Sequence, residues 1–306
     1  MLHFRDWLLL IATISSIVAG IIRPDYGKPF QPYPVYCMMA LLFFAFLPIR
    51  LGAILNSVKS SLPHLGYCLF QKLILLPSAA FFAFRYMFSK YALAALLLSG
   101  VSSGVSSPFF AGLMEANISL VFAMVVASSV LVPFTLPAMV HILCGKYMEI
   151  SLLAMSRLLG LVIFCPLIIA EILKQFVPNF AAKLSKGQYS VSLLSFVITN
   201  LGVFSRYASF LHEEPSTVLI CLGVSVILAV GYFVAGLLFS RRRSLPDRLS
   251  LIISLGVINN VLVMVLGFEF FSHLEATVAA MYMIPFFGLI VPLRLYRNRA
   301  AKKGPP

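Results

Sequence analysis

The chain has 306 residues, of which 61% are hydrophobic and only 11% are charged. A soluble domain carries roughly a quarter charged residues, so this composition excludes a soluble globular protein and indicates an integral membrane protein. The formal net charge of +13 does not indicate a nucleic-acid partner, because the basic residues stand mainly in short connections between apolar segments.

About ten apolar segments, each long enough to cross a bilayer, follow one another along the chain. They lie at approximately 7–22, 33–54, 63–84, 91–114, 117–143, 150–173, 189–211, 217–240, 248–268 and 274–295. Their short connections leave no room for a soluble domain. A secretory signal peptide could begin as the first segment does, but removing that segment would spoil the charge asymmetry of the connections.

The basic residues predict the orientation of these segments. With the N-terminus inside, cytoplasmic connections hold about three times as many Lys and Arg residues as external ones, as the positive-inside rule requires. The run Arg241–Arg243 and the basic tail at 297–306 contribute much of this excess and could also touch anionic lipid. We therefore expect an integral protein of the plasma (inner) membrane with both termini in the cytoplasm.

Two apolar segments are interrupted by small and polar residues, at Ser99–Pro108 and at Ser254–Asn260. A backbone can leave its helix inside a membrane only where it lines a cavity or is enclosed by protein. The interruptions fall in the fourth of five spans in each half of the chain, which predicts two inverted five-helix repeats whose broken spans cross near a shared binding site. Alternatively, the small residues only permit close helix packing. Pro108 and the paired amides at 259 and 260 favour the cavity.

Several motifs carry a resemblance to a known family, in the family's order and spacing. They are Ser103–Pro108 in place of the signature G-G-x-x-S-N, Glu115-Ala-Asn117, Pro133 and Pro137, Gly145–Ile150, Gly231–Gly236, Leu245-Pro246, and Leu255–Asn259. Over most of its length the chain thus resembles the bile acid:sodium symporter family.

The resemblance implies an all-α membrane fold of ten helices in two parts. A panel would comprise about 1–61 and 147–215, and a core about 62–146 and 216–296, followed by the basic tail. The family transports organic anions such as bile acids, sulfated steroids or small carboxylates, coupled to two sodium ions. The sequence offers no nucleophile, metal cluster or phosphate-binding glycine loop, so we expect no enzyme activity and, sodium apart, no cofactor.

The sodium ligands of the family are largely missing. In the ninth span the pattern E-x-G-x-Q-N becomes Ser254–Asn259, so its Glu and Gln are lost. The signature Asn is Pro108, and the Ser and Thr of the fifth span align with Val121 and Val125. Hard cations need several oxygen ligands, so we do not expect two ordinary sodium sites. Gln71 and Ser254, with backbone carbonyls, could rebuild one.

Charged residues within or beside the spans are the other candidates for coupling or binding. Arg206 offers a bidentate fork for a carboxylate or sulfate, unless it pairs with Glu213 or Glu214. Glu115 and Glu269 follow the broken spans and could carry a proton, or could be solvated loop residues. Further proton candidates are His141, Glu171 and His273, and Lys72 is ambiguous between snorkelling and function.

The sequence predicts a secondary transporter of a small organic anion that does not use two-sodium coupling. The open alternatives are a sodium symporter with rebuilt sites and a non-transporting sensor. Beyond the bilayer and the substrate no partner is expected, and the protein would be a monomer or weak homodimer. The predicted substrate-binding residues are Val105, Ser106, Ser107, Asn259, Asn260 and Arg206, and the coupling candidates are Gln71, Ser254, Glu115 and Glu269.

Overall fold

The computed structural model describes residues 4–48, 62–145 and 151–302. Within these ranges the regular structure is helical and no strand forms, which confirms the predicted all-α class. One isolated antiparallel bridge, between Ser103 and Ile258, is the only β-type pairing in the described residues.

The helices of the first half include one broken segment. They are α1 (Phe4–Ile22), α2 (Pro24–Gly27), η1 (Lys28–Phe30), α3 (Pro34–Phe46), α5 (Leu62–Phe70), the π-helical η2 (Gln71–Leu75), α6 (Leu76–Met87), η3 (Ser89–Tyr91), α7 (Ala92–Gly100), α8 (Ser107–Leu113) and α9 (Ile118–Cys144).

The second half also contains long, bent and broken helices. They are α10 (Leu152–Phe176), α11 (Pro178–Ser185), α12 (Gln188–Arg206), α13 (Ala208–Glu213), α14 (Pro215–Phe239), α15 (Leu245–Gly256), α16 (Asn260–Phe270), α17 (His273–Met281), α18 (Met283–Gly288) and α19 (Ile290–Lys302).

Several of these helices suit a membrane. Four are long and apolar enough to cross one, and three bent pairs raise the number to seven if each pair is a single span. The four are His64–Met87, Ile118–Cys144, Leu153–Phe176 and Pro215–Phe239. These apolar helices agree with an integral membrane protein.

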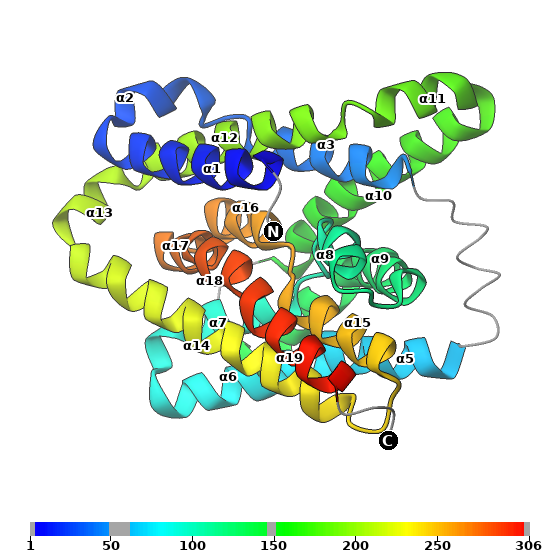
Figure 1. Ribbon diagram of the computed structural model, residues 1–306. Coiled ribbons are helices and arrows are strands. Elements are labelled where there is room, and N and C mark those ends of the chain that lie inside the picture. The colour runs from blue at the N-terminus through cyan, green and yellow to red at the C-terminus, as the bar shows by residue number, and fades with distance from the viewer. Residues whose placement is uncertain (1–3, 49–61, 146–150, 303–306) are drawn as a thin grey trace.

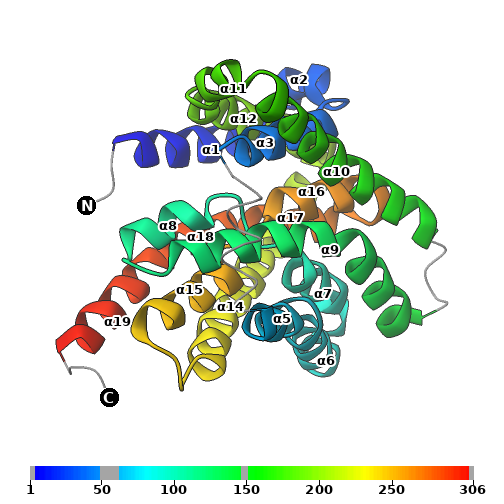
Figure 2. The same cartoon turned by 90° about the vertical axis from the view of Figure 1, so that its right-hand side faces the viewer.

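The helices form two groups that face each other (Figure 1). Helices α1, α3 and α12 pack together with α10 and α11 in one layer, and α5–α7, α14 and α15 lie on the opposite side. Between them lie α8, α9, α16 and α17, in both views (Figure 2). Helix α10 joins the groups because it packs against α3 and α9.

Polar caps mark where the helices begin. Asn117 and Ser151 accept hydrogen bonds from N–H groups in the first turns of α9 and α10. Before α17, Ser272 and Glu275 form a capping box, which ties up the carboxylate of the buried Glu275. Each cap satisfies donors that would otherwise be orphaned in an apolar setting.

The π-helical turn η2 interrupts the span that α5 and α6 form. Such turns insert one residue into a helix and reorient its side chains. Here the turn directs Gln71 and Lys72 inward, where they are 1% and 0% exposed. Two polar side chains are therefore enclosed by protein in the middle of an apolar span.

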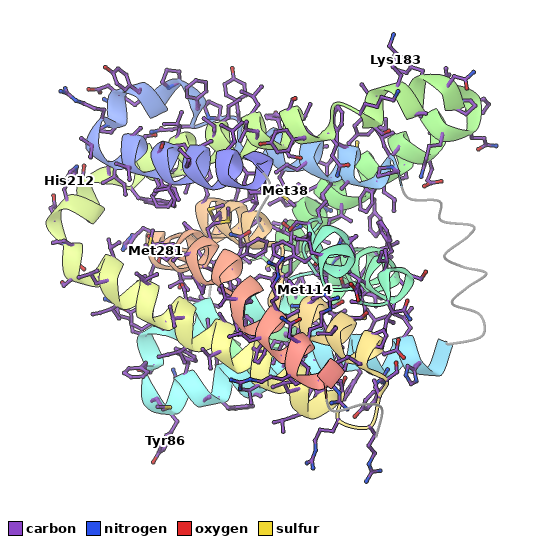
Figure 3. All side chains as sticks on the ribbon, in the orientation of Figure 1. Met38, Tyr86, Met114, Lys183, His212 and Met281 are labelled. Atoms are coloured by element: carbon purple, nitrogen blue, oxygen red, sulfur yellow. The ribbon has the colours of Figure 1, made fainter. Side chains whose placement is uncertain are left out.

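The halves of the broken segments lie at the centre of the protein. Helices α7 and α16 are apolar on nearly all faces, as buried helices are. The interior is filled by flexible side chains such as Met38, Met114 and Met281, whereas Tyr86 and Lys183 project outward from opposite sides (Figure 3). Most residues of the two breaks are therefore enclosed by other helices.

Close packing of α14 against α15 depends on Gly236. A Cβ atom at this position would lie 2.7 Å from Ile252 Cα, whereas a Cβ at Gly231 on the same helix would meet no atom within 4 Å. We expect Gly236→Ala to lower the free energy of unfolding by about 1–3 kcal/mol, because overpacking displaces backbone. Gly231→Ala is the matched control, expected to leave stability unchanged or raise it by up to about 1 kcal/mol. Thermal unfolding of the two purified variants in detergent checks this; equal stability would contradict it.

Candidate functional site

Two helix breaks form the candidate site, residues 101–106 and 257–259, together called the crossing below. Helix α7 ends at Gly100 and the next residue, Val101, is extended with ψ of 162°. Helix α15 ends at Gly256, and α16 begins after Asn259, whose φ and ψ of −85° and 69° are not helical. Small residues and Pro108 in the first turn of α8 make the first interruption favourable.

The two breaks bond directly to each other. The N–H of Gly104 donates to the carbonyl of Val257 at 2.7 Å, and the N–H of Asn259 donates to the carbonyl of Ser102 at 3.0 Å. These bonds satisfy backbone groups that each broken helix leaves without a partner. Each break therefore supplies hydrogen-bond partners for backbone groups of the other, as is required of a backbone that leaves its helix inside a membrane.

Serine hydroxyl groups strengthen the crossing. Ser103 Oγ donates to the carbonyl of Ser254 at 2.8 Å, and Ser107 Oγ donates to the carbonyl of Val257 at 3.0 Å. From α9, Ser128 Oγ accepts the N–H of Ser103 at 3.0 Å. The serines that interrupt the apolar pattern are thus mainly structural donors and acceptors within the crossing.

Side chains also bind the carbonyl ends of the first half-helices. Lys72 Nζ donates to the carbonyl of Ser99 in the last turn of α7 at 3.2 Å. Tyr282 OH donates to the carbonyl of Gly256, the last residue of α15, at 2.7 Å. The hydroxyl groups of Tyr232 and Ser99 are hydrogen bonded at 2.8 Å, and the two tyrosine rings lie 5.9 Å apart. At each of these two helix ends, one carbonyl therefore accepts a hydrogen bond from a side chain of the protein.

Some polar groups near the crossing have no hydrogen-bond partner among the described residues, although they are buried. They are Asn259 Nδ2, the hydroxyl groups of Ser102, Ser129 and Ser254, and both amide atoms of Gln71. Buried polar atoms normally have partners, so these mark places where a ligand or water would be stabilised.

The predicted binding residues occupy different depths. Ser107 and Asn259 are buried in the crossing, Val105 is half-buried, and Ser106 is exposed at the start of α8. Asn260 is also buried, but its Nδ2 donates to the carbonyl of Ala279 on α17 at 3.3 Å. The amide of Asn260 is therefore used within the fold.

The charged candidates lie away from the crossing. Arg206 is exposed with its guanidinium 4.2 Å from the ring centroid of Phe268, which stands eight residues, or about 12 Å, along α16 from its start. Glu115 is exposed, has φ of 54°, and forms an ion pair with Arg297 on α19. Glu269 is exposed near the end of α16.

Three buried residues that contact the half-helix ends were not predicted as site residues: Lys72, Tyr232 and Tyr282. Lys72 was ambiguous in the sequence because a lysine in a span can snorkel to the surface. The two tyrosines look like ordinary aromatic residues of apolar spans. Only their buried hydroxyl groups, which need partners, give a signal that could have identified them.

The residues around the crossing do not suit a sodium ion of the family type. Val121 and Val125 are buried on α9 and supply no oxygen. Ser254 and Ile258 stand where the resemblance places Glu and Gln ligands, so no carboxylate is supplied there. In the part of the chain that the structure describes, no three His, Cys, Asp or Glu side chains gather as a metal site either.

Gly104 is the position where the breaks approach most closely. Its Cβ would lie 2.7 Å from the carbonyl oxygen of Ile258, while a Cβ at Gly112 on α8 would meet only Ile118 Cδ1, at 4.0 Å. We expect Gly104→Ala to separate the breaks and cost about 1–3 kcal/mol of unfolding free energy. Thermal unfolding beside the control Gly112→Ala measures this, and a Gly104→Ala variant as stable as the control would refute the close approach.

A comparison with known families identifies the chain. The model of the sodium bile acid symporter family matches residues 35–214, which is more than half of the sequence and includes the first break. No curated protein matches the sequence. Proteins of this family are membrane transporters rather than enzymes. The chain therefore belongs to the sodium bile acid symporter family.

Proposed function

We propose that this protein is a secondary transporter that binds a small organic anion at the crossing and carries it by alternating access. One observation carries the proposal: Asn259 Nδ2 is a buried donor with no acceptor among the described residues, beside the first turn of α16. A carboxylate or sulfate oxygen would accept from this amide. The positive end of the α16 dipole favours the same charge.

The residues around the crossing differ in exposure, which supports assigning some of them to substrate contact and others to holding the site in shape. Ser106 is exposed and Val105 half-buried, so they and Asn259 would contact the substrate. Ser107 and Asn260 have side chains bonded within the fold and would hold the site in shape. Arg206, the last residue of α12, lies beside Phe268 near the far end of α16, so it suits attracting an anion better than binding it at the crossing.

Alternating access requires two parts that move against each other. We assign residues 1–61 and 147–215 to a panel and residues 62–146 and 216–296 to a core. Helix α16 packs against α3 and α12, which we assign to the panel, as well as against helices that we assign to the core, so this helix would lie where the two parts meet. Rocking of the core would expose this boundary to each side in turn.

Ten spans in two inverted repeats would account for this arrangement. The four continuous spans and three bent pairs, together with α1 and the two broken segments, make ten passages. In the antiparallel crossing α7 packs against α16 and α8 against α15. Opposed insertion of the two broken spans is what an inverted repeat produces.

The charge distribution supports cytoplasmic termini in a plasma membrane. Exposed Arg241 and Arg242 follow α14, and the adjoining Arg248 donates to Tyr296 of α19 at 2.8 Å. At the same end, Asn117 Nδ2 donates to Asp247 at 2.8 Å. A basic cluster at one end of the protein is the positive-inside pattern.

A second candidate is a sodium symporter with one rebuilt cation site. It is favoured by the unpartnered side-chain oxygens of Gln71 and Ser254, which are buried and could coordinate a hard cation. Position 254 holds no carboxylate to offset the charge of a buried sodium ion, which argues against this second candidate. Sodium-independent transport is therefore the first proposal.

Transport assays test the proposal with Asn259→Ala. In proteoliposomes, saturable uptake of at least one tracer among taurocholate, estrone sulfate and pyruvate is expected for the wild type. Losing a hydrogen bond to a charged group costs about 1.5–3 kcal/mol, so Asn259→Ala should weaken the apparent affinity about tenfold or more. Its thermal stability should stay unchanged because no described group bonds to Nδ2.

The exposed Asn298 on α19 provides the control variant Asn298→Ala, which should transport as the wild type does. Binding of a tracer without any flux would indicate a sensor instead of a carrier. If Asn259→Ala transported the tracer with the apparent affinity of the wild type, Asn259 would not be part of the binding site.

A further inference from the structure

Lys72 is the most completely enclosed charged side chain among the described residues. It lies in the π-helical turn η2, is 0% exposed, and donates to the carbonyl of Ser99 at 3.2 Å. Its Nζ lies 6.0 Å from the ring centroid of Tyr232, within the range of a cation–π contact. No described carboxylate forms an ion pair with it.

Enclosing a lysine without a carboxylate is expensive, so a structural role alone explains it poorly. A methionine of similar volume would fill the same space without the desolvation penalty of an ammonium group. Ionisable residues kept inside membrane spans are therefore functional candidates. The carbonyl that Lys72 binds lies at the end of a broken helix, and this position indicates what the function of Lys72 is.

Ser99 lies in the last turn of α7, where carbonyl oxygens carry the negative end of the helix dipole. In broken transport helices such ends attract coupling cations. Here an ammonium group of the chain already binds that oxygen, and at the matching end of α15 Tyr282 binds the carbonyl of Gly256. The attraction for a cation is thus satisfied from within.

The positive charge of Lys72 also matches the negative charge of the proposed substrate. Ser254 stands where the resemblance places the glutamate that offsets bound sodium. With no carboxylate at that position, the positive charge of Lys72 would be offset by the anionic substrate. Ser99 lies three residues before Ser102, which accepts from the N–H of Asn259, so the ammonium stands within roughly 20 Å of the proposed anion site.

We propose that Lys72 is a tethered cation that replaces the dissociable coupling ion at the crossing. This inference rests on the proposed transport function. With Lys72 in its ammonium form the core would carry its own cation, so the anion alone would complete the charge balance.

Thermal unfolding tests the inference without a substrate. The full-length protein in detergent is titrated with sodium chloride, propylammonium chloride or 1-propanol against choline chloride at constant ionic strength. Propylammonium matches the part of the side chain removed in Lys72→Ala, and 1-propanol has the same size without charge. The wild type should show no saturable shift. Lys72→Ala should unfold at a lower temperature and regain stability saturably with propylammonium but not with 1-propanol.

Two further variants complete the test. Lys90→Ala, at an exposed lysine, should behave as the wild type in every titration. Lys72→Met should fold without any cation, because it refills the space, but should lose uptake of the tracer anion that the wild type carries. This variant keeps the inference testable if Lys72→Ala does not fold.

Three results would overturn the inference: a saturable shift of the wild type with sodium, equal rescue of Lys72→Ala by propanol and propylammonium, or wild-type uptake by Lys72→Met. Failure of the proposed function gives a different result, because then the wild type carries none of the tracers while the thermal titrations still report on Lys72.

Discussion

A peptide group that leaves its helix inside a membrane must find another hydrogen-bond partner within the protein, and the arrangement of this chain depends on that requirement. The first break supplies the carbonyl that the N–H of Asn259 needs, and the second supplies the carbonyl that Gly104 needs. Because neither break is satisfied alone, the two halves of the chain must bring them together. Gly104, without a Cβ, allows the approach, and Ser103 and Ser107 add side-chain bonds across it.

The same requirement governs the carbonyl ends of α7 and α15. In this protein Lys72 and Tyr282 donate to them, and the adjoining Tyr232 connects the two caps through its ring and hydroxyl contacts. Val121, Val125 and Ser254 stand where the resemblance places oxygen-rich ligands of the family pattern. The missing ligands and the protein donors at the helix ends thus occur in the same part of the protein. If the protein is a carrier, as we propose, Lys72 would supply the positive charge there.

The sequence predicted both breaks because glycine, serine, proline and paired asparagines are conspicuous in apolar segments. It could not predict which backbone groups pair, since Ser103 and Ile258 are 155 positions apart and pairing depends on how the halves pack. Lys72 remained ambiguous because only the π-helical turn shows that it faces inward. Glu115 and Arg206 attracted attention as charges near spans, yet tertiary contacts with Arg297 and Phe268 hold them outside the crossing. The bends at 30–34 and 185–188 were also missed, because the segments before them carry charged residues such as Lys28 and Lys183 and resemble connections between spans.

The most direct test of the account is the sodium dependence of transport. The initial rate of tracer-anion uptake into proteoliposomes is measured with an inward sodium gradient and with an equal choline gradient, at the same membrane potential. The account predicts equal initial rates and no accumulation driven by the sodium gradient. Uptake that requires sodium and saturates with its concentration would contradict it, because a dissociable cation would then do what the ammonium of Lys72 is proposed to do.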